Sequence, residues 1–244
     1  MRRLLILLPL LGIIACGAQM QQMNFDYEGR DYSAKILAIC PIPENAIKVG
    51  NPKELADNFK GDPRKAAKVI QDSLYKLFIN AALKKATNCR VLRKRFTPAE
   101  FNDMYDSKNS TTETLTIGAK GPTYNFRVPT VQCLEEKGVP RDFVLFINKL
   151  IFVRQRAGEE IQSGVPGPSS GTMMGGGGAP PDLASETEYI LWDYSLNKVV
   201  SFGKIKVETP IAKDITDKNW HSNINTMIMK LFDKTPFKFM DLIY

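Results

Sequence analysis

Short apolar runs along this chain predict the strands of one sheet. Residues 34–40, AKILAIC, are apolar and are closed by two prolines, which is typical of a buried strand. Residues 142–155, DFVLFINKLIFVRQ, are the most apolar strand candidate and predict the central strand. Residues 188–194 and 199–207 predict a hairpin around the turn at 195–198. Together these segments predict a sheet that ends in an antiparallel meander.

Two longer segments have the spacing of helices. Asp62 and Pro63 are typical of a helix start, and apolar residues recur at helical spacing from there to Ala86. Residues 217–234 form the second helix and carry a continuous apolar face. That face consists of Trp220, Ile224, Met227, Ile228, Leu231 and Phe232.

Shorter elements fill the middle of the chain. The residues Thr97-Pro98-Ala99-Glu100 are a capping box that opens a short helix through Met104, and residues 129–138 predict another. Residues 89–96 predict a strand, and residues 114–128 predict a strand pair after a polar loop at 105–113. The order of elements predicts a single α/β domain, with a mixed sheet, a C-terminal antiparallel meander and helices packed on the sheet.

One long segment has the composition of a disordered loop. Residues 157–186 are rich in Gly, Pro and Ser and contain four consecutive glycines, Gly175 to Gly178. Such a segment cannot bury enough apolar surface to offset the entropy lost on ordering. Because strands are predicted on both sides, we expect this loop to lie inside the domain.

The N-terminus has the features of a signal peptide. Arg2 and Arg3 precede an apolar stretch of eleven residues, Leu4 to Ile14. Apolar regions of secretory signals run to about 7–15 residues, whereas a membrane-spanning helix needs about 20. Residues 1–15 are therefore expected to direct export and to be removed. The alternative, a buried strand of a cytosolic protein, does not explain the two leading arginines.

The residues Ile13-Ile14-Ala15-Cys16 resemble the lipobox of bacterial lipoproteins. That resemblance implies cleavage before Cys16 and a diacylglycerol on its sulfur, and two or more acyl chains anchor a protein stably. Gly17 follows the cysteine; the absence of Asp there implies the outer membrane, facing the periplasm. We expect a lipidated tether at 16–33 and a folded domain at 34–244.

Three further cysteines are present: Cys40, Cys89 and Cys133. The periplasm permits one disulfide among them, in any of three pairings. Three buried, apolar thiols are the equally good alternative. The absence of a CxxC pair and of a neighbouring histidine argues against a metal or redox site.

The chain is mildly basic, with a formal net charge of +7, of which Arg2 and Arg3 supply two. This charge is weak evidence for nucleic acid, which an exported protein is not expected to bind. A basic cluster predicts contacts with an anionic membrane surface, each side chain adding about 1 kcal/mol, although a solvated face explains it as well. The cluster consists of Lys84, Lys85, Arg90, Arg93, Lys94 and Arg95.

Residues that could support catalysis are few, and the sequence predicts no catalytic residue, cofactor or metal. His221 is the only histidine and neighbours the apolar face of its helix. Ser73 and Lys76 have the S-x-x-K spacing of penicillin-recognising enzymes, but they lie within a predicted helix rather than at its start, and no K-T-G follows.

The closing part of the chain resembles a small α/β domain shared by the N-terminal part of TolB, the penicillin-binding-protein activator lipoproteins and the curli-secretion lipoproteins. The residues behind this resemblance are Asp142-Phe143-Val144-Leu145, Trp192-Asp193-Tyr194 and Val199-Val200. It implies a domain that binds a protein partner without catalysis. We therefore expect a membrane-anchored envelope lipoprotein that binds an envelope protein. A periplasmic hydrolase and a lipoprotein that binds a small ligand or glycan are the alternatives.

Overall fold

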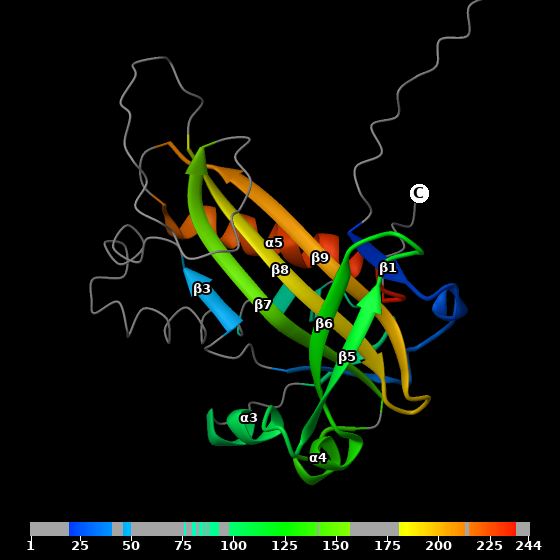
Figure 1. Cartoon of the computed structure of the whole chain (residues 1–244). Helices are drawn as coiled ribbons and strands as arrows, with labels where there is room; N and C mark the ends of the chain where they lie inside the picture. Colours follow the sequence, from blue (N-terminus) through cyan, green and yellow to red (C-terminus); the bar gives the residue numbers. More distant parts are fainter. Residues whose placement is uncertain are drawn as a thin grey trace, which may run out of the picture.

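The fold is built around a mixed sheet of long and very short strands (Figure 1). The computed structural model describes residues 20–40, 46–49, 88–92, 98–140, 142–156, 181–212 and 215–237, with single positions between 76 and 86. The strand order is β1-β9-β8-β7-β2-β4, and β3 also pairs with β7. The strands are β1 (Gln21–Met23), β2 (Ile36–Ile39), β3 (Ile47–Val49), β4 (Arg90–Val91), β7 (Phe143–Arg156), β8 (Pro181–Asp193) and β9 (Lys198–Pro210).

The three long strands β7, β8 and β9 form the predicted antiparallel meander. The turn between β8 and β9 spans residues 194–197, and Asn197 adopts the left-handed φ of 52° that asparagine tolerates. On the other side of β7, the strands β2 and β3 run parallel to it, and β4 runs parallel to β2. The sheet is therefore mixed, with β7 in its interior as its apolar sequence predicts.

Helix α5 (Asp217–Phe232) covers one face of the sheet. Thr216 and Asn219 cap its start reciprocally, and its six predicted apolar residues are all buried. They pack in one cluster with alternate side chains of β7, β8 and β9.

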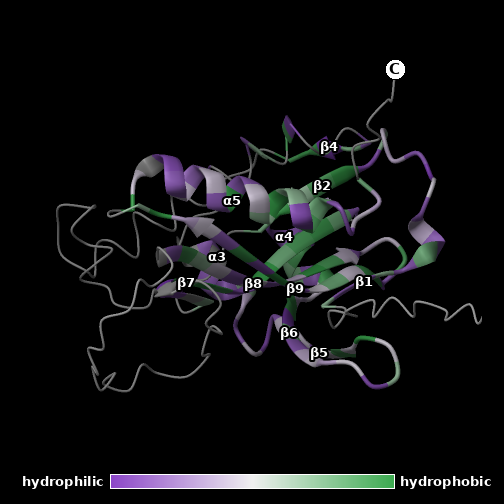
Figure 2. Ribbon diagram, turned by 90° about the horizontal axis from the view of Figure 1, so that it is seen from above, coloured by the Kyte–Doolittle hydropathy of each residue, from purple (hydrophilic) through white to green (hydrophobic). Residues whose placement is uncertain are grey.

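The opposite face of the sheet is covered at one end by four smaller elements (Figure 2). Phe126 of the hairpin and Met104 and Leu134 of the helices pack there against Phe146 and Ile190 of the sheet. These elements are the hairpin strands β5 (Ser110–Thr116) and β6 (Thr123–Pro129), which form a separate antiparallel sheet, and the helices α3 (Pro98–Met104) and α4 (Val131–Glu136).

The predicted fold class and most of its elements are confirmed. The meander, the buried strand at 36–39, the strand pair predicted at 114–128 and the helices α3, α4 and α5 are all present. Most of the predicted helix at 62–86 and all of the segment 157–180 lie outside the described residues.

Two boundaries were wrong. Strand β8 begins at Pro181, so the last six residues of the predicted loop 157–186 belong to the sheet. Strand β5 begins at Ser110, inside the predicted polar loop. Both segments are polar in sequence, and both become strands because a neighbouring strand supplies the backbone partners.

The boundary between tether and domain was also wrong. Residues 20–33 are part of the fold: β1 pairs with β9, a 3-10 turn η1 (Phe25–Tyr27) follows, and Tyr27 and Tyr32 are buried. The domain therefore begins at or before Met20, and not at residue 34.

Candidate functional site

The N-terminal strand β1 lies on the outer edge of β9 and follows, five residues later in sequence, the cysteine predicted to carry the lipid anchor. Its three residues pair antiparallel with Ser201–Gly203. The backbone N–H of Lys204 donates to the carbonyl of Met20 at 2.7 Å, and the N–H of Asn24 donates to the carbonyl of Val200 at 2.8 Å. Backbone hydrogen bonds thus continue past both ends of the strand.

Gly203 permits this close approach of β1. Its φ is 145°, a conformation that other residues rarely adopt, and a Cβ atom there would lie 2.2 Å from the carbonyl oxygen of Met20 and 2.6 Å from the Cα of Gln21. A side chain at position 203 is therefore incompatible with β1 in its observed place.

Aromatic side chains hold the segment that follows β1. The ring of Tyr32 packs edge-on against Phe143 at 5.2 Å and Phe237 at 5.8 Å between centroids, and Tyr27 packs against Phe143 at 6.2 Å. These contacts join the N-terminal segment to the start of the central strand and to the chain after α5. Tyr27 and Tyr32 are consequently part of the core.

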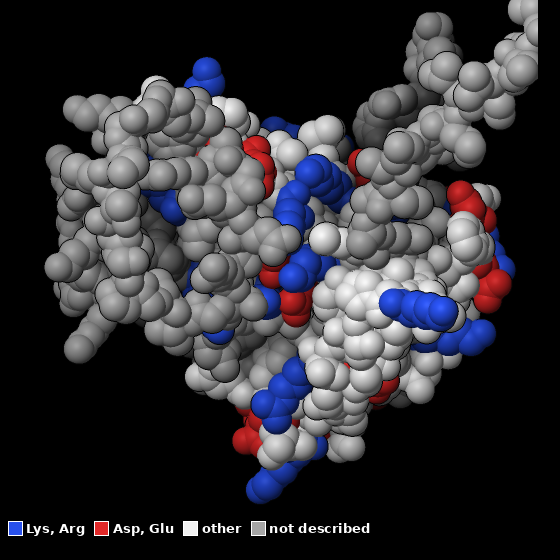
Figure 3. Space-filling view, turned by 45° about the horizontal axis from the view of Figure 1, so that its top comes forward, with Lys and Arg blue, Asp and Glu red and all other residues white. Residues whose placement is uncertain are grey.

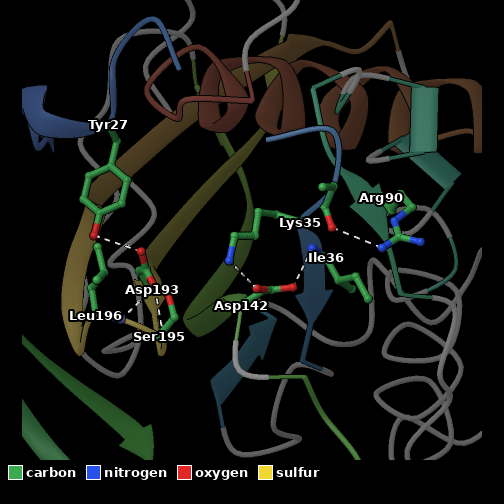
Figure 4. A network of polar contacts seen from close by, with 9 residues as sticks. Tyr27, Lys35, Ile36, Arg90, Asp142, Asp193, Ser195 and Leu196 are labelled. Atoms are coloured by element: carbon green, nitrogen blue, oxygen red, sulfur yellow. Dashed lines mark hydrogen bonds and ion pairs between the residues drawn. The ribbon is translucent and has the colours of Figure 1, made fainter. Parts of the chain in front are cut away.

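A polar network fixes the same end of the domain (Figure 4). The hydroxyl of Tyr27 donates to Oδ2 of Asp193 at 3.1 Å, and Oδ1 of Asp193 accepts from Ser195 and from the N–H of Leu196. Burial and the Asp193 carboxylate raise the pKa of Tyr27, so the phenol stays protonated as a donor. The network ties η1 to the β8–β9 turn.

Asp142 has a similar structural role between β2 and β7. Its carboxylate accepts from the backbone N–H of Ile36 at 3.0 Å and from Nζ of Lys35 at 3.1 Å. Asp142 and Asp193 are the acidic residues of the two motifs on which the resemblance rests. Both carboxylates serve backbone positioning in this fold.

The predicted lipidation residue lies close to this edge in sequence. Cys16 itself is outside the described residues. Met20 follows it by four residues, which reach roughly 14 Å when fully extended at about 3.5 Å each. The short distance replaces the 18-residue tether that the sequence predicts.

Large apolar side chains are exposed mainly at this end of the domain. Phe25 in η1 is 80% exposed, Leu196 in the β8–β9 turn is 57% exposed, and Met20 is 36% exposed. Among the described residues, the one other exposed large apolar side chain is Met229, on α5. The hydrogen bonds of Asp193 link the turn that carries Phe25 to the turn that carries Leu196.

A second polar feature crosses the middle of the sheet on the face opposite α5 (Figure 3). Glu186 is almost fully buried and pairs with Lys204 at 2.8 Å and Lys149 at 3.2 Å. Lys149 also pairs with Glu188, and Lys206 lies 3.9 Å from Glu186. Burial alone would lower the pKa of Lys149, but the two glutamates outweigh it and raise the pKa. We call these five residues the charged row.

A buried amide lies at the bulge of β7 that adjoins the charged row. The register of β7 and β8 shifts between Ile147 and Lys149, and the side-chain amide of Asn148 has no hydrogen-bond partner. The charged row satisfies its own charges, and no predicted site residue belongs to it. No local sequence pattern indicates the charged row, because the paired residues come from three strands.

Cys40, Cys89 and Cys133 are all buried free thiols. Cys40 and Cys133 belong to the cluster under the hairpin, whereas Cys89 belongs to the cluster under α5. Burial raises the pKa of all three thiols, that of Cys89 to about 12. The structure therefore has the apolar thiols of the second alternative and not a disulfide.

The predicted basic cluster is described only in part. Lys84 and Arg90 are exposed, and Arg90 donates to the carbonyl of Ala34 at 3.1 Å. Arg90 begins β4, the edge of the sheet opposite to β1. Lys85, Arg93, Lys94 and Arg95 lie outside the described residues, as does Ser73.

The described part of the chain contains few other groups that could act in catalysis or bind a metal ion. His221 is exposed on α5, and no three His, Cys, Asp or Glu side chains among the described residues are grouped to hold a metal ion. Within the same residues, no helix has the length and apolar character needed to cross a bilayer.

No family model and no curated protein matches the chain. Among solved structures, PelC from Paraburkholderia phytofirmans, crystallised as a dodecamer, is 10% identical, with a TM-score of 0.36 over 89% of this chain and 98% of that one. The hypothetical protein CT253 from Chlamydia trachomatis is 11% identical, with a TM-score of 0.40 over 82% of this chain and 91% of that one.

A third match is described as a homolog of a neuraminyllactose-binding hemagglutinin, from Helicobacter pylori. It is 12% identical, with a TM-score of 0.29 over 87% of this chain and 88% of that one. Because these identities and TM-scores are low, the proposed function rests on the residues of this chain.

Proposed function

We propose that this chain is a cell-envelope lipoprotein, anchored through lipid on Cys16, whose α/β domain binds an envelope protein without catalysis of its own. The observation that carries the proposal is the lipobox Ile13-Ile14-Ala15-Cys16, placed after two arginines and an apolar stretch of signal-peptide length. The fold supports it, because the described domain starts within four residues of Cys16.

The use of its ionisable groups supports a non-catalytic role. Asp142 and Asp193 accept hydrogen bonds from backbone N–H groups, and Glu186 is neutralised by lysines. The described thiols are buried and protonated, which removes their nucleophilic form. These acids and thiols are engaged in holding the domain together and are poorly placed to meet a substrate.

The location is proposed from the residues around the cysteine. Gly17 stands where an aspartate would retain an enterobacterial lipoprotein at the inner membrane, so the outer membrane, with the domain in the periplasm, is the proposed location. The partner is proposed to be a protein of the same compartment.

The test compares the parent protein with Cys16→Ser in its own cells, using chemical crosslinking in intact envelopes and affinity recovery. We expect the parent to sediment with the membrane and to recover one protein reproducibly and in stoichiometric amount. Cys16→Ser should stay unprocessed and lose the lipid. Processing of Cys16→Ser like the parent would contradict the anchor. Recovery of no specific protein by the acylated parent would contradict partner binding and favour a small ligand or glycan.

A further inference from the structure

We propose that the domain stands on its membrane with the β1 edge of the sheet downward, and that Phe25 and Leu196 enter the interfacial layer of the bilayer. This inference rests on the proposed lipid at Cys16 and adds the orientation of the domain and the surface that contacts the lipids. It replaces the basic cluster as the membrane-contacting surface.

The position of Cys16 in the sequence limits how far the lipid can lie from the β1 edge. Met20 is held to β9 by the hydrogen bond from Lys204, so the lipidated residue stays within roughly 14 Å of this edge. From β1 to β4 the sheet spans five strand spacings of about 4.8 Å, roughly 24 Å in all. With the sheet upright, the β1 edge can therefore lie at the bilayer while the β4 edge, which carries Arg90, stands away from it.

An exposed apolar side chain lies at this edge. Phe25 has four-fifths of its surface exposed, although the residues on either side of it are polar. The 3-10 turn that presents it is capped by Asn24, whose side chain accepts from the N–H of Asp26 at 3.0 Å, and is held by the bond from Tyr27 to Asp193. The backbone that presents Phe25 is therefore held in place, and phenylalanine and leucine are among the side chains by which surface-bound segments enter the interfacial layer.

The exposed charged side chains near Phe25 are mostly acidic. Asp26, Glu28 and Asp31 are exposed close to Phe25 in sequence, and the exposed bases are Arg30 in the same segment and Lys198 beside Leu196, so this surface carries a net charge of −1. Such a surface gains nothing from anionic lipids, so we assign the contact to zwitterionic lipid and to apolar insertion. This separates it from the basic cluster, which would bind in proportion to anionic lipid content.

The experiment places single tryptophans and measures their quenching by brominated lipids. Acylated Phe25→Trp, Arg90→Trp and His221→Trp are purified from cells, and the lipid on Cys16 is verified by mass spectrometry before use. Each protein is reconstituted in vesicles of zwitterionic brominated phosphatidylcholine, with and without anionic lipid. Trp192 and Trp220 are buried and give the same background in every variant.

We expect the tryptophan at position 25 to shift to shorter wavelength and to lose most of its added emission in brominated vesicles, with no dependence on anionic lipid. Arg90→Trp at the opposite edge and His221→Trp, near the end of α5 that lies away from β1, should keep theirs. Quenching at position 90 without quenching at 25, or equal quenching at all three positions, would overturn the orientation. A chain without lipid on Cys16 would fail at the mass measurement, which concerns the proposed function and not the orientation.

Discussion

The docking of β1 on β9 can be tested by one methyl group, Gly203→Ala. In the observed structure the new Cβ would lie 2.2 Å from the carbonyl oxygen of Met20, so β1 must move away. The φ of 145° adds strain of about 1–3 kcal/mol for an alanine. Displacing β1 also breaks the hydrogen bonds to Met20 and from Asn24, worth about 1 kcal/mol each.

We expect Gly203→Ala to lower the free energy of unfolding by about 3–5 kcal/mol, measured by urea denaturation of a chain that begins at residue 17. Chymotrypsin should cut after Tyr27, which is buried in the parent, much faster in the variant. Gly118→Ala is the matched control: its φ of 56° is also left-handed, but the space around it is open. Gly118→Ala should lower the free energy of unfolding by roughly 1–2 kcal/mol and leave Tyr27 protected from chymotrypsin. Equal midpoints and equal cleavage for both variants would refute the docking of β1.

Three further outcomes follow from the same contacts. Tyr27→Phe keeps the ring packing but leaves Oδ2 of Asp193 without its donor. It should lower the free energy of unfolding in urea by about 1–3 kcal/mol. No loss would show that the network adds nothing to stability. Glu186→Gln leaves Lys149 and Lys204 without their shared carboxylate and should lower the free energy of unfolding by about 1–3 kcal/mol. Glu188→Gln should lower it clearly less, because Glu188 pairs with only one of these lysines. Equal losses would contradict the assigned pairing. Burial raises the pKa of Tyr189 from 10.0 to about 12 and that of Cys89 from 9.0 to about 12, so their stabilising contribution is complete below pH 9 and is lost as pH rises toward 12. Thermal denaturation should show a midpoint that falls above pH 9, less steeply in Tyr189→Phe, and a flat profile would contradict the burial of these groups.

Strong local periodicity made much of the fold predictable. The apolar run of β7, the hairpin of β8 and β9 and the six-residue face of α5 each bury one side of a regular element, so their pattern appears in the sequence. The same holds for α4, where Thr130 caps the start and Gly138 follows the end with a φ of 69°.

The candidate site was far less predictable, because its stability comes from distant residues. Strand β1 has the sequence QQM and no strand pattern of its own, and it forms because β9 offers an open edge and Gly203 offers space. Its one sequence indication was the pair Tyr27 and Tyr32 within a polar segment, since aromatic side chains seldom stay exposed together. The charged row was hidden for the same reason, because the partners of Glu186 are 18 to 37 residues away in sequence.

The short connection between Cys16 and the sheet has a mechanical consequence. A lipoprotein on an 18-residue tether samples many orientations, whereas a domain whose edge strand starts five residues after the proposed lipid site would be confined near the bilayer. The proposed partner would then approach at the membrane surface, or from the faces and the edge that point away from it. This confinement distinguishes the structure from the tethered arrangement that the sequence predicts.

The central claim is that Cys16 carries the anchor, and the most direct test is mass spectrometry of the N-terminal peptide from the protein's own cells. The account predicts a peptide that begins at Cys16 and bears a diacylglycerol on its sulfur. A peptide that still contains residues 1–15, with an unmodified thiol at Cys16, would contradict it.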